Sequence, residues 1–104
     1  MTTRGFVFHP WEHIAEELET RGWTQKYFAQ LIKKSPQEVN HIISGRRNLD
    51  ADWAYRLSAA FGTSAQVWLN LQAKYDLAVL EEDKEERKLF DLIRLNVQKQ
   101  EVFA

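Results

Sequence analysis

Two amide side chains, Gln37 and Asn40, lie three residues apart in a short segment, 36–43, that begins with a proline. Residues three apart share one face of a helix, so both amides would point in the same direction. Each amide offers a hydrogen-bond donor and an acceptor, the pair of groups that reads the edge of an adenine in the major groove. Pro36 and His41 flank the two amides on that face. The segment therefore predicts a helix that contacts base edges in DNA.

The residues around this segment are suited to holding phosphates. Thr24 and Gln25 open the preceding helix, where outward-pointing N–H groups and the helix dipole favour an anion. Residues 24–47 carry five basic side chains against the single acid Glu38. The predicted DNA-binding residues are Thr24, Gln25, Lys34, Ser35, Pro36, Gln37, Asn40, His41, Arg46 and Arg47. In a protein that does not bind DNA, these residues would be helix caps and ordinary surface side chains.

Residues 24–45 have the arrangement that would place these side chains on DNA. They predict two short helices joined by a tight turn, with the small residue Ala29 where the helices cross. This is the helix-turn-helix pattern, whose second helix lies in the major groove. Ser35 and Glu38 form a capping box at the start of the second helix, and Gly45 is its expected left-handed end.

The flanking sequence predicts further helices. One precedes the pair, from Pro10 to the terminating Gly22, and two follow it with N-caps at Asp50 and Ser64. No run alternates with the period of a strand except 6–8, so the chain is predicted to be all-α. Apolar residues at helical spacing predict the buried faces, which are Ile14, Ala15 and Leu18, then Phe28, Leu31 and Ile32, then Val39, Ile42 and Ile43, then Ala54, Leu57 and Phe61, and finally Val67, Trp68, Leu71 and Tyr75.

Length and composition predict one folded domain. The chain has 104 residues, of which 44% are hydrophobic and 28% charged, enough for one core and too apolar for wholesale disorder. It has no cysteine, which excludes a disulfide framework and a thiolate zinc site. We expect an N-terminal arm at 1–8, a DNA-binding domain at 9–79 and a C-terminal amphipathic tail at 80–104. No apolar run suits a signal peptide or a membrane span, so a cytoplasmic location is expected.

The last quarter of the chain differs from the rest. It combines the charge run LEEDKEERK with apolar residues at helical spacing, namely Phe90, Ile93 and Val97, with Leu89 and Leu92 alongside. This pattern predicts an amphipathic helix. Three roles stay open for this helix. It can fold back on the core, pair with a second subunit, or become ordered only on a partner.

Catalytic or metal chemistry fits the sequence poorly. His9 and His13 lie four apart, a spacing that places two imidazoles on one helical face as metal ligands. No third ligand follows at a suitable spacing, which favours capping and surface roles for both. Trp68 is predicted to lie in the core, whereas the pattern does not place Trp11 and Trp53, and an exposed one would mark a partner surface. We expect no enzymatic activity, no cofactor and no metal.

Residue blocks on both sides of the helix pair resemble the HigA family of antitoxins, small members of the lambda-repressor-like (Xre) helix-turn-helix group. The blocks are His9-Pro10 with Glu12, Glu16–Leu18, Trp23–Gln25, Ser44–Arg47, Arg56–Ser64, Trp68–Gln72 and Tyr75–Leu77. The most specific part is the ending, GTS followed by WLNLQ and YDL, which a generic repressor lacks. The resemblance implies a five-helix lambda-repressor-like domain with an additional C-terminal helix.

The resemblance also implies the function of an antitoxin in a type II toxin–antitoxin system. Such a protein neutralises a HigB-like ribonuclease toxin and represses its own operon as a homodimer on double-stranded operator DNA. Two alternatives stay open. One is a dimeric helix-turn-helix transcriptional regulator without a toxin partner, and the other is a protein-binding module that has lost DNA recognition.

Three residues depart from the family pattern at the turn. Lys33 stands where the family usually has glycine, and a left-handed conformation there costs about 1 kcal/mol. Lys34 takes a position that is normally apolar and buried, and Pro36 replaces a polar contact. These departures predict a reshaped turn and base reading by fewer side chains, and they motivate the last alternative.

Overall fold

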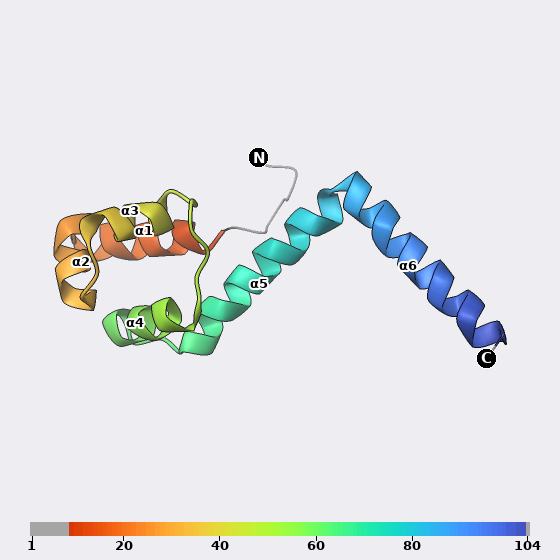
Figure 1. The fold of residues 1–104 in the computed structure, drawn as a ribbon. Coiled ribbons are helices and arrows are strands. Elements are labelled where there is room, and N and C mark those ends of the chain that lie inside the picture. The colour runs from red at the N-terminus through yellow and green to blue at the C-terminus, as the bar shows by residue number, and fades with distance from the viewer. Residues whose placement is uncertain (1–8, 104) are drawn as a thin grey trace.

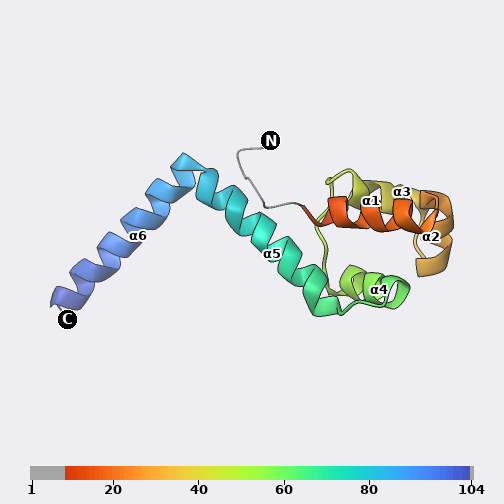
Figure 2. The same cartoon turned by 180° about the vertical axis from the view of Figure 1, so that it is seen from behind.

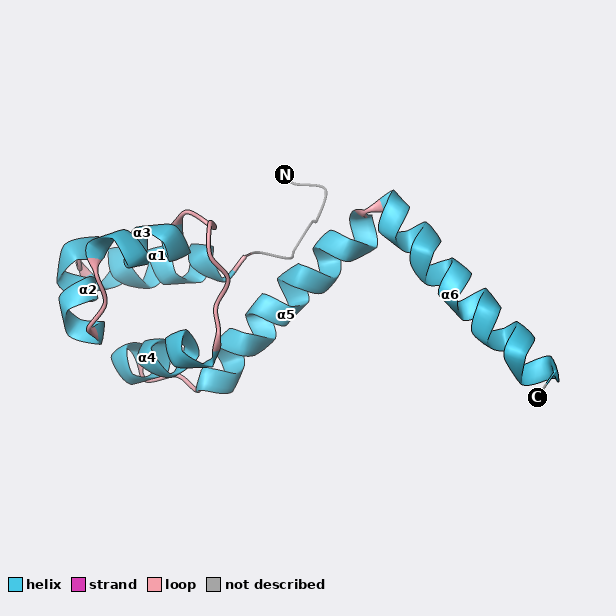
Figure 3. Cartoon of the chain, in the orientation of Figure 1, coloured by secondary structure: helices cyan, strands magenta, loops and turns pink. Residues whose placement is uncertain are grey.

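The computed structural model describes residues 9–103 of the chain, with side chains as far as residue 100 (Figures 1 and 3). The described residues form six helices and no strand, which confirms the all-α prediction. The predicted arm at 1–8, and with it the alternating run 6–8, lies outside the described residues. The helices are α1 (Pro10–Arg21), α2 (Gln25–Ile32), α3 (Pro36–Ile43), α4 (Ala51–Phe61), α5 (Ala65–Glu82) and α6 (Lys84–Phe103).

Local capping signals set the helix ends. The first five helices each begin at a side chain that accepts a backbone N–H two or three residues further on, and these caps are His9, Thr24, Ser35, Asp50 and Ser64. Gly22 and Gly62 close α1 and α4 in the left-handed conformation that glycine adopts without strain. Gly45 is also left-handed, at φ 78°, and follows the C-cap residue Ser44 of α3.

Helices α1 to α4 and the first half of α5 enclose one core. It contains Ile14, Leu18, Phe28, Ala29, Ile32, Val39, Ile42, Leu49, Trp53, Ala54, Leu57, Phe61 and Trp68. Ala29 is fully buried, and α2 packs against α3, as the sequence predicts. Trp53, which the pattern does not place, is completely buried, and Trp11 is half-buried. Neither tryptophan is therefore an exposed marker of a partner surface.

Three residues predicted to be buried are exposed. Leu31 is 43% exposed and Val67 is 47% exposed, and Ala15 on α1 is exposed as well. On α5 the inward side is set by Trp68 and by Gln72, a polar residue that apolar periodicity does not select. Its Oε1 accepts the N–H of Leu49 at 2.8 Å and its Nε2 donates to Asp76 Oδ1 at 3.0 Å, so burial leaves the amide satisfied.

The C-terminal helices extend away from the core. Figures 1 and 2 show α5 leaving the bundle and α6 continuing beyond a bend without another helix beside it. The bend lies at Asp83, whose Oδ1 accepts the N–H groups of Glu85 and Glu86 at 3.0 and 3.1 Å and so starts a new helix. The possibility that this helix folds back on the core is wrong. Within residues 9–103, no helix is long and apolar enough to cross a membrane.

Candidate nucleic-acid interface

Helix α3 is a short capped helix with one free edge. The Ser35 hydroxyl accepts the N–H of Glu38 at 3.1 Å and donates to the Glu38 carboxylate at 3.2 Å, the capping interaction that the sequence predicts. Val39 and Ile42 are almost completely buried against the core. Since side chains repeat every 3.6 residues, the opposite side of α3 faces outward.

The two predicted base-reading amides lie on this outward side. Gln37 and Asn40 are both exposed, and the neighbouring His41 is half-buried. Asn40 Nδ2 donates to Gln25 Oε1 at 3.5 Å, which joins the start of α2 to the exposed edge of α3. Thr24 caps α2 by accepting the N–H of Tyr27 at 3.0 Å. The structure therefore places the start of α2 beside the amides on α3, as an interface with DNA requires.

The turn between these helices accommodates a lysine in place of glycine. Lys33 has φ 62° and ψ 45°, and in the described residues it is the one non-glycine residue with positive φ. Its N–H and that of Lys34 donate to the carbonyls of Gln30 and Ala29 at 3.4 and 3.0 Å. The turn thus keeps the hydrogen bonds of a left-handed helix end, and Lys33 bears the backbone strain.

Lys34 directs its charge away from the exposed edge of α3. Its side chain is only 17% exposed, and its ammonium lies 3.4 Å from Glu38 Oε2 and 3.3 Å from Asp52 Oδ2. It also lies 5.2 Å from the centroid of the Trp53 ring, a cation–π contact. The apolar side chain expected at this position is replaced by a cation that packs on a buried indole and joins α3 to α4.

The carboxylates around Lys34 are held in their charged form. Desolvation opposes ionisation of Glu38, but the hydrogen bond and charge of Lys34, together with hydrogen bonds from Ser35, lower its pKa below the ordinary value. The hydrogen bond from Arg56 lowers the pKa of Asp52 against partial desolvation, and Lys34 lowers it further. Both carboxylates therefore stay ionised over the neutral pH range.

The loop after α3 presents the two predicted arginines. The carbonyl of His41 accepts the N–H groups of Arg46 and Arg47 at 2.9 and 3.2 Å, which fixes the backbone. A Cβ on Gly45 would overlap the indole of Trp11, so this position needs glycine for space as well as for its positive φ. Both arginine side chains are exposed, and Arg47 also pairs with Asp50 at 3.5 Å.

The histidine expected to cap α1 is part of a buried cluster. His9 Nδ1 accepts the N–H of Trp11 at 3.1 Å, which confirms its capping role, but the imidazole is buried, not on the surface. It stacks on Trp11 at 3.9 Å between centroids and meets the edge of Tyr75 at 4.4 Å. Burial lowers the pKa of His9, opposed by a hydrogen bond with Asn48 and the charge of Asp76. Residues 9–100 contain no cluster of three metal-ligating side chains.

Two exposed cations lie outside the predicted set. Lys26 lies on α2 and Lys33 is the C-cap of that helix. Neither forms an ion pair with a carboxylate among the residues that the structure describes. The excess of basic residues in 24–47 is the sequence signal that points to them. They can supply the charge that Lys34 directs elsewhere.

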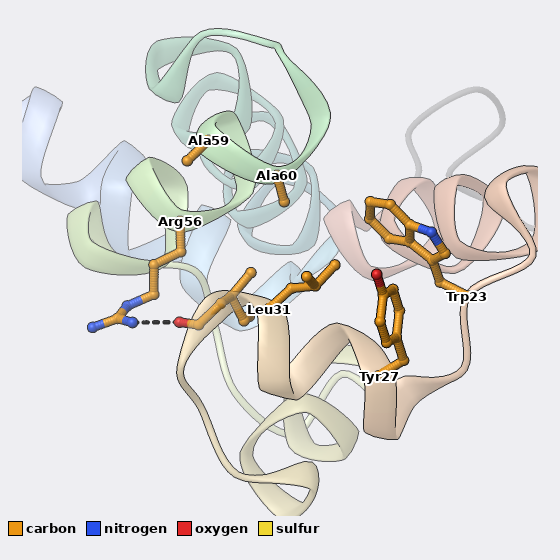
Figure 4. Close-up of a pocket in the computed structure, with 7 residues that line it drawn as sticks. Trp23, Tyr27, Leu31, Arg56, Ala59 and Ala60 are labelled. Atoms are coloured by element: carbon orange, nitrogen blue, oxygen red, sulfur yellow. Dashed lines mark hydrogen bonds between the residues drawn. The ribbon is translucent and has the colours of Figure 1, made fainter.

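An apolar groove lies between α2 and α4, and it explains the exposure of Leu31. Its volume is about 480 Å³, and its walls are Trp23, Tyr27, Leu31, Ile32, Arg56, Ala59 and Ala60. Figure 4 shows Arg56 on α4 reaching the carbonyl of Ile32, which it hydrogen-bonds at the end of α2. Ala59 and Ala60 on α4 have small side chains, and they leave space beside Leu31 that larger side chains at these positions would fill.

The chain matches the helix-turn-helix family over residues 14–68. Virulence-associated protein I of Dichelobacter nodosus is 41% identical over 80 residues, which are 76% of this chain and 74% of the relative. YddM of Escherichia coli K12, described as an uncharacterized HTH-type transcriptional regulator, is 30% identical over 84 residues, which are 81% of this chain and 89% of the relative.

Solved structures show the same relationship. The structure of the Pseudomonas aeruginosa antitoxin HigA with the higBA promoter is 39% identical to this chain, with a TM-score of 0.67. The match covers 70% of this chain and 80% of that one. The chain therefore belongs to the helix-turn-helix family, in the group that includes the HigA antitoxins.

Proposed function

We propose that this chain is an antitoxin that neutralises a HigB-like ribonuclease toxin and represses its own operon by binding operator DNA as a homodimer. The observation that carries the DNA-binding half is the free edge of α3, where exposed Gln37 and Asn40 lie beside the start of α2. The likeness to an antitoxin whose structure includes its promoter supports both halves.

Each predicted contact residue has a role in this proposal. Gln37 and Asn40 hydrogen-bond base edges, with Pro36 and His41 packed beside them. Thr24, Gln25 and the N–H groups that open α2 hold one phosphate, and Arg46 and Arg47 hold another. Ser35 and Lys34 act indirectly, because one caps α3 and the other ties it to α4. Lys26 and Lys33 supply further charge for the phosphates.

A salt series of gel shifts on the DNA upstream of the gene tests this half. Each phosphate contact steepens the fall of affinity with salt, so Arg46→Ala should weaken binding to all sequences and reduce the salt slope by about 1. Lys74→Ala, which removes an exposed cation from α5, is the matched control and should leave the slope unchanged. Unshifted DNA even at about 50 mM salt, where phosphate contacts are strongest, would refute DNA binding.

The toxin-binding half rests on the family and on the groove between α2 and α4. Its walls combine Trp23, Tyr27 and Arg56, the residue types that dominate protein interfaces, with the exposed Leu31. We place the toxin contact there. Leu31→Asp should reduce growth rescue when the chain is co-expressed with the toxin encoded next to it, while the operator gel shift stays unchanged. Full rescue by this variant would exclude the groove as the contact.

The second candidate function is a transcriptional regulator without a toxin, favoured by the description of the E. coli relative. The two functions differ in one experiment. Expression of the neighbouring open reading frame alone should stop growth if it encodes a toxin, and co-expression of this chain should restore it. Equal growth in both cultures would exclude the antitoxin function and leave the regulator.

A further inference from the structure

Trp11 is a large aromatic residue that the hydrophobic core does not use. Among the described residues it belongs neither to the buried cluster nor to the apolar side chains packed against that cluster, although it is half-buried. Part of its cover is the connection between α3 and α4, residues 44–50, which Figures 1 and 2 show passing the start of α1. We call this connection the arginine loop, because it carries Arg46 and Arg47.

The contact between Trp11 and the arginine loop is made at Gly45. A Cβ on this residue would overlap three atoms of the six-membered ring of Trp11, which are Cε3, Cζ3 and Cη2. The indole therefore lies directly against the backbone of Gly45, which has no side chain to separate them. The next two residues are Arg46 and Arg47, whose N–H groups both donate to the carbonyl of His41 near the end of α3. The backbone of the arginine pair thus starts at a point that Trp11 supports.

The indole of Trp11 is itself held in place. Its ring centroid lies 3.9 Å from that of His9, with 28° between the ring planes, and 6.1 Å from that of Tyr75 on α5. His9 also accepts the backbone N–H of Trp11 and meets the edge of Tyr75. These contacts join the start of α1 to α5 and keep the indole under the arginine loop.

The arginine loop is anchored again directly after the arginine pair. Asn48 hydrogen-bonds to His9, and the N–H of the buried Leu49 donates to Gln72 Oε1 at 2.8 Å. The backbone is therefore fixed on both sides of the two arginines, whose side chains are exposed. The loop has this shape before any partner binds.

We propose that Trp11 is a positioning residue for operator binding, which supports Gly45 so that Arg46 and Arg47 meet a phosphate from a loop that is already ordered. Ordering a loop and two long side chains at the moment of binding lowers the affinity, and a preformed loop avoids this loss. The inference rests on the proposed function in one respect, that the two arginines bind phosphate. Trp11 acts through them.

Operator gel shifts in two backgrounds test the proposal. Trp11→Leu keeps an apolar side chain but removes the ring that reaches Gly45, and it should weaken operator binding about fivefold. In a chain that also carries Arg46→Ala and Arg47→Ala, the same substitution should weaken binding by less than about twofold, because no arginine is left to position. A general loss of stability would act equally in both backgrounds. Circular dichroism and a thermal melt check that each variant is folded at the temperature of the gel shift.

Tyr55→Leu is the matched control for the loss of an aromatic ring. Tyr55 lies on α4, outside the arginine loop, and is 70% exposed. Its substitution should leave operator affinity unchanged in both backgrounds. Equal weakening by Trp11→Leu with and without the two arginines, or no weakening when both arginines are present, would overturn the proposal.

Amide hydrogen exchange in the free protein tests the support of the loop without DNA. Trp11→Leu should speed exchange at the N–H groups of Arg46 and Arg47, because the loop opens more often once the indole is gone. The N–H of Leu57, within α4, should keep its exchange rate. Unchanged exchange at both arginines would also overturn the proposal.

This proposal and the proposed function fail in different ways. An operator shift that Trp11→Leu weakens equally in both backgrounds refutes the positioning role and leaves DNA binding in place. No operator shift by the unmodified protein refutes DNA binding, and with it the role of Trp11 in operator binding, even where hydrogen exchange shows that the indole supports the loop.

Discussion

At the scale of single residues, Lys33 occupies a backbone conformation that favours glycine. The turn tolerates it because the hydrogen bonds that close α2 are all formed. Lys33→Gly should therefore raise the free energy of unfolding by about 1 kcal/mol, since glycine has no Cβ to strain. Urea unfolding measures this change. Lys26→Gly, in the helix that Lys33 closes, should lower the free energy of unfolding by about 1 kcal/mol. A Lys33→Gly variant that is no more stable than the unmodified protein would contradict the strain.

The amides on α3 allow a second test at this scale. Gln37→Ala or Asn40→Ala should reduce discrimination between operator and unrelated DNA by about 1–3 kcal/mol, because a bidentate contact to a base is lost. The fold should stay intact, since both side chains are exposed. Competition gel shifts measure the ratio, with Gln98→Ala, an exposed amide on α6, as the control. Unchanged operator preference in both α3 variants would refute their role.

At the scale of elements, the start of α1 depends on a neutral imidazole. His9 accepts the N–H of Trp11, and burial lowers its pKa. The unfolded chain therefore binds a proton at a higher pH than the folded chain does. The contribution of His9 to stability is fully present above its unfolded pKa of about 6.5 and is lost as the pH falls through the folded value.

Acidification should thus destabilise the protein through this cap. The free energy of unfolding should fall between about pH 7.5 and 5, as urea titrations at each pH will measure. His9→Asn supplies a helix cap that does not titrate, so its stability should depend less on pH over the same range. An equal slope for both proteins would show that another group controls the effect.

The packing of α2 and α4 gives a further test of the fold. Leu57 is completely buried, and Leu57→Ala should cost about 2–5 kcal/mol through the cavity it leaves. Leu31, which the sequence predicts to be buried, is about half exposed at the groove. Leu31→Ala should therefore lower the free energy of unfolding by only about 1 kcal/mol or less. Thermal unfolding of the two variants compares them. Similar losses would mean that Leu31 is covered in solution.

At the scale of the whole molecule, the core and the tail are separate units. No core residue lies beyond Trp68, and buried Gln72 is the last buried residue in the described part of the chain. A chain ending at residue 83 should therefore keep the unfolding temperature of the full chain, because it keeps every buried residue of the core. Calorimetry of the two proteins at the same concentration measures this, and a lower unfolding temperature for the shortened chain would contradict the separation of core and tail.

The sequence by itself determined where the first five helices begin and where α1 and α4 end. Caps such as Ser35 and Asp50, and left-handed glycines such as Gly22, act through hydrogen bonds within a few residues, so their effect can be read locally. The same holds for the exposed edge of α3, because Val39 and Ile42 fix its buried side. The family resemblance then supplied the function that the caps and spacing do not imply.

Only the tertiary structure decided which neighbours each side chain meets. The ion pair of Lys34 with Asp52 joins residues eighteen positions apart, and the contact of His9 with Tyr75 joins the first helix to the fifth. The exposure of Leu31 depends on the alanines of α4 across the groove. The course of α6 likewise depends on the cap at Asp83 and not on the periodicity of its apolar residues. That periodicity is the same for a helix that packs against its own core and for one that does not.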